Sequence, residues 1–152
     1  MANAQPAAAA LAGKWTYRSF LNDPAQVTTD PDPDVDARNL LAILFAEAVF
    51  TFEIPNATTL EGKIDWDGGG LDLKGTIRED AMSGGPLVAI VGTGRPNTAT
   101  ANWEYDYHAQ LAYQWPNGVN QVPALVGNVI RAKPHGGNPA GVVASFIAVK
   151  QP

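Results

Sequence analysis

Apolar and polar residues alternate with a period of two along eight segments of this chain, and Gly, Pro, Asn and Asp residues separate the segments. Successive side chains of a strand point to opposite faces, so this alternation predicts β-strands with one buried and one exposed face. The predicted strands cover residues 13–20, 48–54, 59–66, 71–78, 86–94, 102–115, 122–132 and 141–150.

The clearest pair of strands is 59–66 with 71–78. Leu60, Ile64 and Trp66 share one face of the first strand, and the second strand repeats the same alternation. The residues between them, Asp67-Gly68-Gly69-Gly70, suit a turn that needs positive φ. The pattern therefore predicts a hairpin with one buried face and one exposed face.

The sixth segment, 102–115, carries an aromatic face and a polar face. Its odd positions are Trp103, Tyr105, Tyr107, Ala109, Leu111, Tyr113 and Trp115, and its even positions include Glu104, Asp106 and His108. We expect the rings to point into an enclosed interior and the acidic neighbours to meet water. Residues 86–94, in contrast, are apolar on both faces, so we expect a loop or another subunit to cover the second face.

Eight successive strands joined mostly by short turns predict an all-β fold, a single eight-stranded antiparallel up-and-down β-barrel. Closing the sheet removes its edges, and a barrel of this size holds side chains or one small ligand. Glycines inside the strands allow sharp coiling or leave space in the lumen; they are Gly62, Gly75, Gly92 and Gly127. One short helical segment is predicted near residues 37–47, with Asp36 as its cap.

The domain bounds follow from the same pattern. We expect residues 1–12 to be a flexible lead-in and residues 13–152 to form the barrel domain. The acidic, proline-rich connection after the first strand is expected to be a solvated loop or a lid over the barrel mouth.

Composition narrows the function classes. The chain has 152 residues and a net charge of −5, with ten scattered basic residues, which argues against nucleic-acid binding. It has no cysteine, which excludes disulfides, thiolate zinc sites and cysteine nucleophiles. The Ala run near the start has no Lys or Arg before it and is poor in large apolar residues, so it does not match the pattern of a signal peptide. We therefore expect a cytoplasmic location, with export left open, and no membrane span.

The tripeptide Gly13-Lys14-Trp15 resembles the opening strand of the calycin superfamily, which includes lipocalins, fatty-acid-binding proteins and avidins. Together with the eight strands, the chain is similar to small bacterial lipocalin-like domains. The resemblance implies a ligand-binding barrel whose base is closed by the Trp15 indole, with a basic side chain from a late strand across it. Arg131 is the first candidate for that side chain and Lys150 the second. No set of polar residues here matches the biotin site of avidins.

The candidate ligand-binding residues are the inward-facing rings. A lumen with apolar walls and a few oriented polar groups is typical of a ligand pocket, although the same rings could simply fill the barrel. The candidates are Tyr17, Phe50, Phe52, Trp66, Trp103, Tyr105 and Tyr107.

Other candidate groups have simpler interpretations. His108 beside Glu104 and Asp106 could move protons or bind a metal, but a solvated outer face is the favoured interpretation, and His135 lies in a predicted exposed loop. No motif indicates a metal site or a cofactor, and we expect neither. Arg18 and Arg95 are the cations that could meet an anionic head group, or they lie on the surface.

The sequence thus predicts a protein that binds a small, mostly apolar molecule in a barrel lumen. The alternative is a cofactor-free enzyme, an isomerase, cyclase or hydrolase, that uses Tyr, His or carboxylate groups in the barrel. A homo-oligomer formed through strand 86–92 is the third hypothesis.

Overall fold

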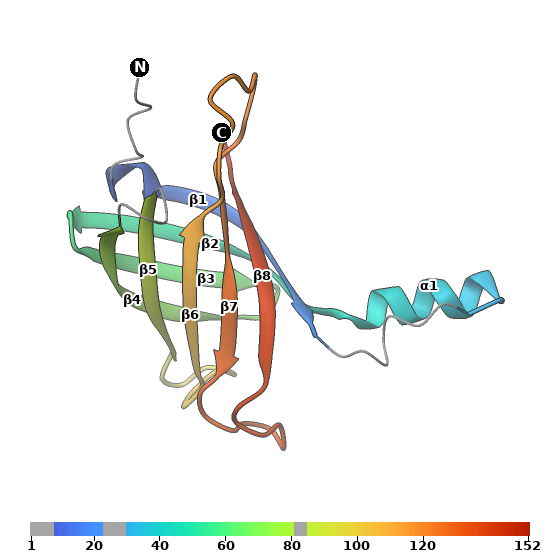
Figure 1. Cartoon of the computed structure of the whole chain (residues 1–152). Helices are drawn as coiled ribbons and strands as arrows, with labels where there is room; N and C mark the ends of the chain where they lie inside the picture. The colour runs from blue at the N-terminus through green and yellow to red at the C-terminus, as the bar shows by residue number, and fades with distance from the viewer. Residues whose placement is uncertain (1–7, 23–29, 81–84) are drawn as a thin grey trace.

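Eight antiparallel strands close into one barrel in the computed structural model, which describes residues 8–22, 30–80 and 85–152 (Figure 1). Each strand pairs with the next along the chain, and the last pairs with the first. The strands are β1 (Gly13–Leu21), β2 (Leu44–Asn56), β3 (Thr59–Trp66), β4 (Gly69–Asp80), β5 (Gly85–Gly94), β6 (Glu104–Leu111), β7 (Ala124–Arg131) and β8 (Val143–Lys150). The predicted all-β fold, an eight-stranded up-and-down barrel, is confirmed.

The alternation in the sequence sets which side chains enter the barrel. On β3 and β4 the odd–even pattern holds along the strands, and residues Asp67 and Gly68 join them in a two-residue turn with Gly68 at φ 88°. The interior is continuous, because the apolar faces of all eight strands meet there. Its most deeply buried large apolar side chains are Leu11, Trp15, Phe50, Leu60, Ile64, Leu71, Leu73, Leu125 and Val129.

One end of the barrel is closed by η1 (Ala8–Leu11), a short 3-10 helix whose Ala8 and Leu11 belong to the core. Trp15 is fully buried beneath it and donates its indole N–H to the Leu11 carbonyl at 2.9 Å. The end of β8 places Lys150 Nζ 5.7 Å from the Trp15 ring centroid, and Lys150 also donates to the Ala10 carbonyl at 2.7 Å.

The basic side chain across Trp15 is therefore Lys150, and the first candidate, Arg131, is wrong for this role. Register explains the difference, because Trp15 and Lys150 are directly paired between β1 and β8. Arg131 ends β7, which runs away from the closed end, so it lies at the opposite end of the barrel.

The helix α1 (Pro33–Ala42) lies earlier in the chain than predicted. Its N-cap is Asp32, which accepts a hydrogen bond from the Asp34 N–H at 2.9 Å, and residues from Leu44 onward are strand. Proline at the first helical position has no N–H to lose and favours a start there. The helix buries no residue and extends away from the barrel in Figure 1, so this part of the long connection is no lid; residues 23–29 lie outside the described residues. None of the described helices has the length and apolar character needed to cross a membrane.

One strand prediction needs correction. The sixth strand ends at Leu111, and Tyr113 and Trp115 are about three-quarters exposed in the following loop, at 74% and 71%. Alternation continues past Leu111, but a strand needs a partner, and β7 begins only at Ala124. On β5 the outward Ala89 and Val91 are exposed and Leu87 is half-buried, so the described residues cover only part of the second face of that strand, and its cover by another subunit stays a prediction.

Candidate functional site

The other end of the barrel is open and holds a cavity of about 430 Å³. The start of β2, the end of β3, the start of β6 and the end of β7 meet there with the loop that joins β7 to β8. The apolar and aromatic residues that line it are Tyr17, Phe45, Ala46, Ala48, Ile64, Trp66, Leu71, Trp103, Tyr105, Tyr107 and Val129, and the charged or ionisable ones are Glu47, Asp67, Arg131 and His135.

The floor of the cavity is aromatic and electrically neutral. The rings of Tyr17 and Tyr107 meet edge to face, with centroids 6.1 Å apart. Burial raises the pKa of the Tyr17 hydroxyl and of the Tyr107 hydroxyl, so both stay protonated across the physiological range. The floor can therefore offer hydroxyl dipoles to a ligand but no negative charge.

Five of the seven candidate ligand-binding residues line this cavity: Tyr17, Trp66, Trp103, Tyr105 and Tyr107. The inward direction predicted for the rings of the sixth strand is the one observed. Phe50 and Phe52 do not line the cavity; they stack at 4.8 Å in the filled part of the barrel. Whether any of these residues binds a ligand stays a prediction.

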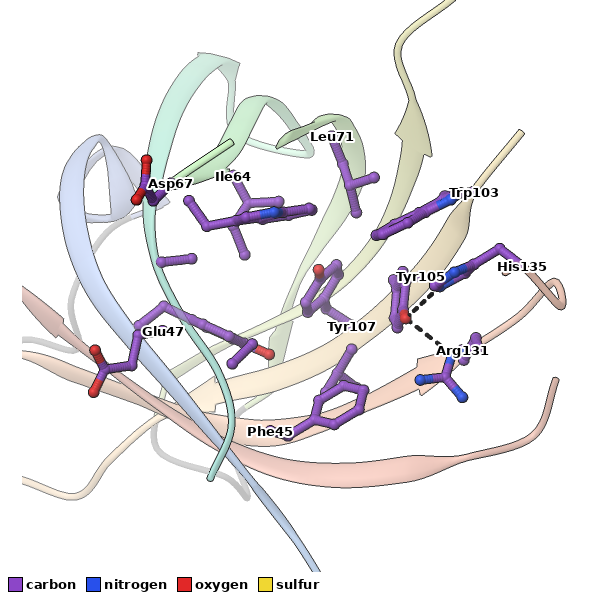
Figure 2. A pocket seen from close by; sticks show the side chains of 15 residues that line it. Phe45, Glu47, Ile64, Asp67, Leu71, Trp103, Tyr105, Tyr107, Arg131 and His135 are labelled. Carbon is purple, nitrogen blue, oxygen red and sulfur yellow. Dashed lines mark hydrogen bonds between the residues drawn. The ribbon is translucent and has the colours of Figure 1, made fainter. Parts of the chain in front are cut away.

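A hydrogen-bonded group of three polar side chains lies on one wall of the cavity (Figure 2). Arg131 donates its Nε–H to the Tyr105 hydroxyl at 2.9 Å, and the same hydroxyl is 2.7 Å from His135 Nε2. Because the guanidinium can only donate, the hydroxyl oxygen accepts from Arg131. The direction of the bond to His135 depends on the tautomer of that ring: a neutral ring with its proton on Nδ1 accepts the hydroxyl proton at Nε2, and a ring protonated on Nε2 donates to the hydroxyl oxygen.

The His135 ring is fixed by stacking and by its turn. It lies on Trp103 with centroids 3.6 Å apart and planes 12° from parallel. Backbone bonds between His135 and Asn138 close a tight turn through Gly136 and Gly137, both at positive φ. His135 was expected to be exposed. The Gly-Gly pair was the signal for a tight turn, but the position of that turn beside Trp103 is a property of the closed barrel.

Arg131 is a buried cation, 7% exposed, in an aromatic setting. Its guanidinium carbon lies 5.6 Å from the Phe45 centroid and 5.8 Å from the Tyr105 centroid, and Nη1 donates to the Pro139 carbonyl at 3.1 Å. Within the described ranges no carboxylate comes within ion-pair distance of it, and the ion pairs found there use other cations.

The two arginines expected to meet an anionic group are not in the cavity. Arg95 bonds to Asp65 at 2.9 Å and to Asp72 at 3.0 Å on the outside of the barrel. Arg18 pairs with Glu47 at 3.1 Å, with both side chains more than half exposed. Arg18 is at an outward-facing position in the alternation of β1, whereas Arg131 is at an inward-facing position of β7.

The polar face of β6 also stays outside. His108 is exposed, and Glu104 and Asp106 are half-buried on the same outer surface. Burial, followed by the neighbouring Glu104, raises the pKa of Asp106. Across the described parts of the chain, no three or more His, Asp or Glu side chains gather closely enough to hold a metal ion.

A second hollow, of about 540 Å³, lies along β2, β3 and β4. Most of the side chains around it are charged or polar, such as Glu53, Glu61, Lys63 and Lys74. Ligand pockets are mostly apolar with few polar groups, so the open end of the barrel is the better candidate site.

The effect of the Arg131 charge on its hydrogen-bonded neighbours can be measured as a change in the His135 pKa. Burial, and then the charge of Arg131, lower the His135 pKa below the ordinary histidine value. The unfolded chain therefore takes up this proton first, and the associated stability is lost as the pH falls through the ordinary histidine range. We expect Arg131→Gln to raise the His135 pKa, measured by NMR titration of the imidazole nitrogens.

Lys133→Gln is the matched control for this titration, because Lys133 is a nearby cation that pairs with Glu104 instead. It should leave the His135 pKa unchanged. The chain has only two histidines, and His108→Gln assigns the signals. An unchanged His135 pKa in Arg131→Gln would contradict the contact described above.

Comparison of the chain with protein-family models, with curated proteins and with solved structures finds no match in any of the three.

Proposed function

We propose that this barrel binds one small, mostly apolar molecule in the cavity at its open end. The observation that carries the proposal is the cavity itself, whose walls are mainly aromatic and aliphatic and whose hydrogen-bonded polar side chains, Tyr105, Arg131 and His135, lie on one wall. Its volume of about 430 Å³ lies within the range of about 300–1,000 Å³ that is common for small-molecule sites.

The lining residues form the walls and the floor of the proposed binding site. Trp66, Trp103 and Tyr105 supply wall area near the mouth, while Tyr17 and Tyr107 form the floor. Burying a ligand's apolar surface against them contributes roughly 25 cal/mol per Å² before the costs of association. Phe50 and Phe52 support the floor from below in this scheme.

Filling the cavity should abolish binding. Ala48 lines it, and Ala48→Leu adds three carbon atoms without removing any contact. We expect the uncharged dye N-phenyl-1-naphthylamine to bind the unmodified protein with enhanced fluorescence. Its affinity should fall at least tenfold in Ala48→Leu, because a well-filled site must expel the dye or strain the wall.

Ala57→Leu is the control, since Ala57 is exposed in the turn at the closed end. It makes the same chemical change and should leave dye affinity unaltered. Absence of dye binding to the unmodified protein, or equal loss in both variants, would overturn the proposal.

A cofactor-free enzyme remains the second candidate, and one contact favours it. The Tyr105 hydroxyl lies 2.7 Å from His135 Nε2, a geometry that can pass a proton to or from a bound molecule. Native mass spectrometry of protein from its natural host separates the candidates through the copurified compound. A binding protein returns that compound unchanged on incubation, whereas an isomerase, cyclase or hydrolase converts it.

The same spectra test the homo-oligomer through residues 86–92. Val91, Ile130 and Val143 stand in one row across β5 to β8, and each is 38–45% exposed on the outer face. A partner subunit that covers this row is the proposal, and a purely monomeric mass distribution at high concentration counts against it.

We also propose kinship with the calycin superfamily. Support comes from Gly13 and Trp15 at the closed end and from Lys150 across the indole. A homologue that aligns these residues with a proven calycin would decide it. Residues 13–152 as the barrel domain, with η1 packed into its core, and the cytoplasm as its location are proposals of the same kind, testable by limited proteolysis and by cell fractionation.

A further inference from the structure

We propose that the ligand of the cavity is a ring-containing monocarboxylate whose carboxylate pairs with Arg131, an inference that rests on the function proposed above. Three features of the described residues support it. They are the guanidinium of Arg131, which has N–H donors without a partner among the described residues, the distribution of charge around the cavity, and the flat aromatic walls.

The guanidinium of Arg131 has donors to spare. An arginine carries five N–H donors, and the hydrogen bonds of Arg131 to the described residues use one on Nε, to Tyr105, and one on Nη1, to Pro139. Nη2 makes no hydrogen bond to the part of the chain that the structure describes. Arg131 lines the cavity while only 7% exposed, so an anion there would pair with a cation that is held in place and largely shielded from bulk water.

The position of Arg131 is fixed before any ligand arrives. Tyr105 and the Pro139 carbonyl hold two of its nitrogens, and the Phe45 ring lies 5.6 Å from its central carbon. A preorganised cation loses little freedom on binding, so more of the pairing energy appears as affinity. Charge-assisted bonds from arginine to a carboxylate are also among the strongest in proteins.

The surrounding charges favour a single negative charge. Figure 2 shows the carboxylates of Glu47 and Asp67 on the opposite side of the cavity from Arg131. Glu47 pairs with Arg18 on the outer surface, so Asp67 supplies the negative charge that would repel a large polyanion. Burial, and then the charge of Arg131, lower the His135 pKa, so at neutral pH this ring adds no second cation. One guanidinium with no second cation beside it matches a carboxylate better than a phosphate, which carries more charge and more oxygens to satisfy.

The walls favour a ligand body made of rings. Phe45, Trp103 and Tyr105 present flat surfaces around the cavity, and Tyr107 lies at its floor (Figure 2). The Trp66 ring also lines the cavity. Aromatic side chains pack well against flat ligands through offset or edge-to-face contacts. A flexible fatty chain would have to lose more conformational freedom to occupy the same compact space.

The test compares two probes of nearly equal shape, 2-naphthoate and its neutral amide, 2-naphthamide, by isothermal titration calorimetry at neutral pH. We expect 2-naphthoate to bind on the order of 10- to 100-fold more tightly, since a hydrogen bond to a charged group contributes about that factor. 2-Naphthyl phosphate is the third probe and should bind more weakly than 2-naphthoate.

Arg131→Gln should remove the preference for the acid and leave the affinity for the amide within about threefold. Arg131→Lys keeps the charge but loses the planar fork, so part of the preference should remain. Arg18→Gln removes a cation on the outer surface and should leave the preference intact. Binding of N-phenyl-1-naphthylamine verifies that each variant still has the cavity, and the comparison of probes on the unmodified protein needs no variant.

The outcomes separate this inference from the proposed function. Equal binding of acid and amide, tighter binding of the phosphate, or a preference that survives in folded Arg131→Gln overturns the inference while the cavity remains a binding site. Failure of the neutral dye to bind the unmodified protein overturns the proposed function and this inference with it.

Discussion

Trp15→Ala is expected to lower the free energy of unfolding by about 4 kcal/mol, the range measured when large buried aromatic residues are truncated. The Trp15 indole is fully buried at the closed end, where it contacts Phe52 at a ring distance of 6.4 Å. The substitution leaves a cavity under η1. It also removes the 2.9 Å hydrogen bond from the indole N–H to the Leu11 carbonyl, which is then left without this donor. Urea denaturation followed by circular dichroism measures the loss.

Trp115→Ala provides the matched control, because Trp115 is the same residue type at 71% exposure. A surface substitution of this kind should change stability by no more than about 0.5 kcal/mol. Equal effects of the two substitutions would mean that the closed end is not packed around Trp15 as described.

Gly127→Ala is expected to destabilise the barrel by about 3 kcal/mol, as overpacking does in a closely fitted structure. A Cβ atom at Gly127 would overlap the His108 carbonyl oxygen and lie 2.8 Å from Ala109 Cα, across the pairing of β6 with β7. Both obstacles are backbone, so no side chain can turn aside and the two strands must separate. The melting temperature and the urea midpoint should both fall.

Gly85→Ala tests whether the loss comes from steric overlap rather than from the change of residue type. Among the described residues, the nearest atom to a Cβ added at Gly85 is Leu111 Cβ at 3.8 Å, an ordinary contact distance. Alanine also restricts the unfolded chain, so this variant should be unchanged or more stable by up to about 1 kcal/mol. A Gly127→Ala protein as stable as the Gly85→Ala protein would contradict the close approach of β6 and β7.

Local patterns were enough to predict most of the barrel. Strand β3 has the predicted bounds, and the rings at 103, 105 and 107 face inward because a strand alternates its side chains whatever its neighbours are. The errors lie where alternation persists without a partner strand. Tyr113 and Trp115 continue the aromatic pattern of β6, yet both are exposed in a loop.

The candidate site was predicted only in part. The aromatic wall follows from parity, so Tyr17, Trp66, Trp103, Tyr105 and Tyr107 could be named in advance. The polar group could not, since Arg131, Tyr105 and His135 are separated by up to 30 residues and meet only after closure. The same closure places Lys150, and not Arg131, across the Trp15 ring.

The sequence by itself determined the number of strands and, except for residues 86–94, the face that each strand buries, because those depend on a period of two and on turn residues nearby in the chain. Only the tertiary structure decided which end of the barrel is filled and which is hollow. It also decided which cation meets which ring and that His135 stacks on Trp103. Those features depend on the register between strands and on the path of the loops at the open end. Neither can be predicted from the pattern of any single segment.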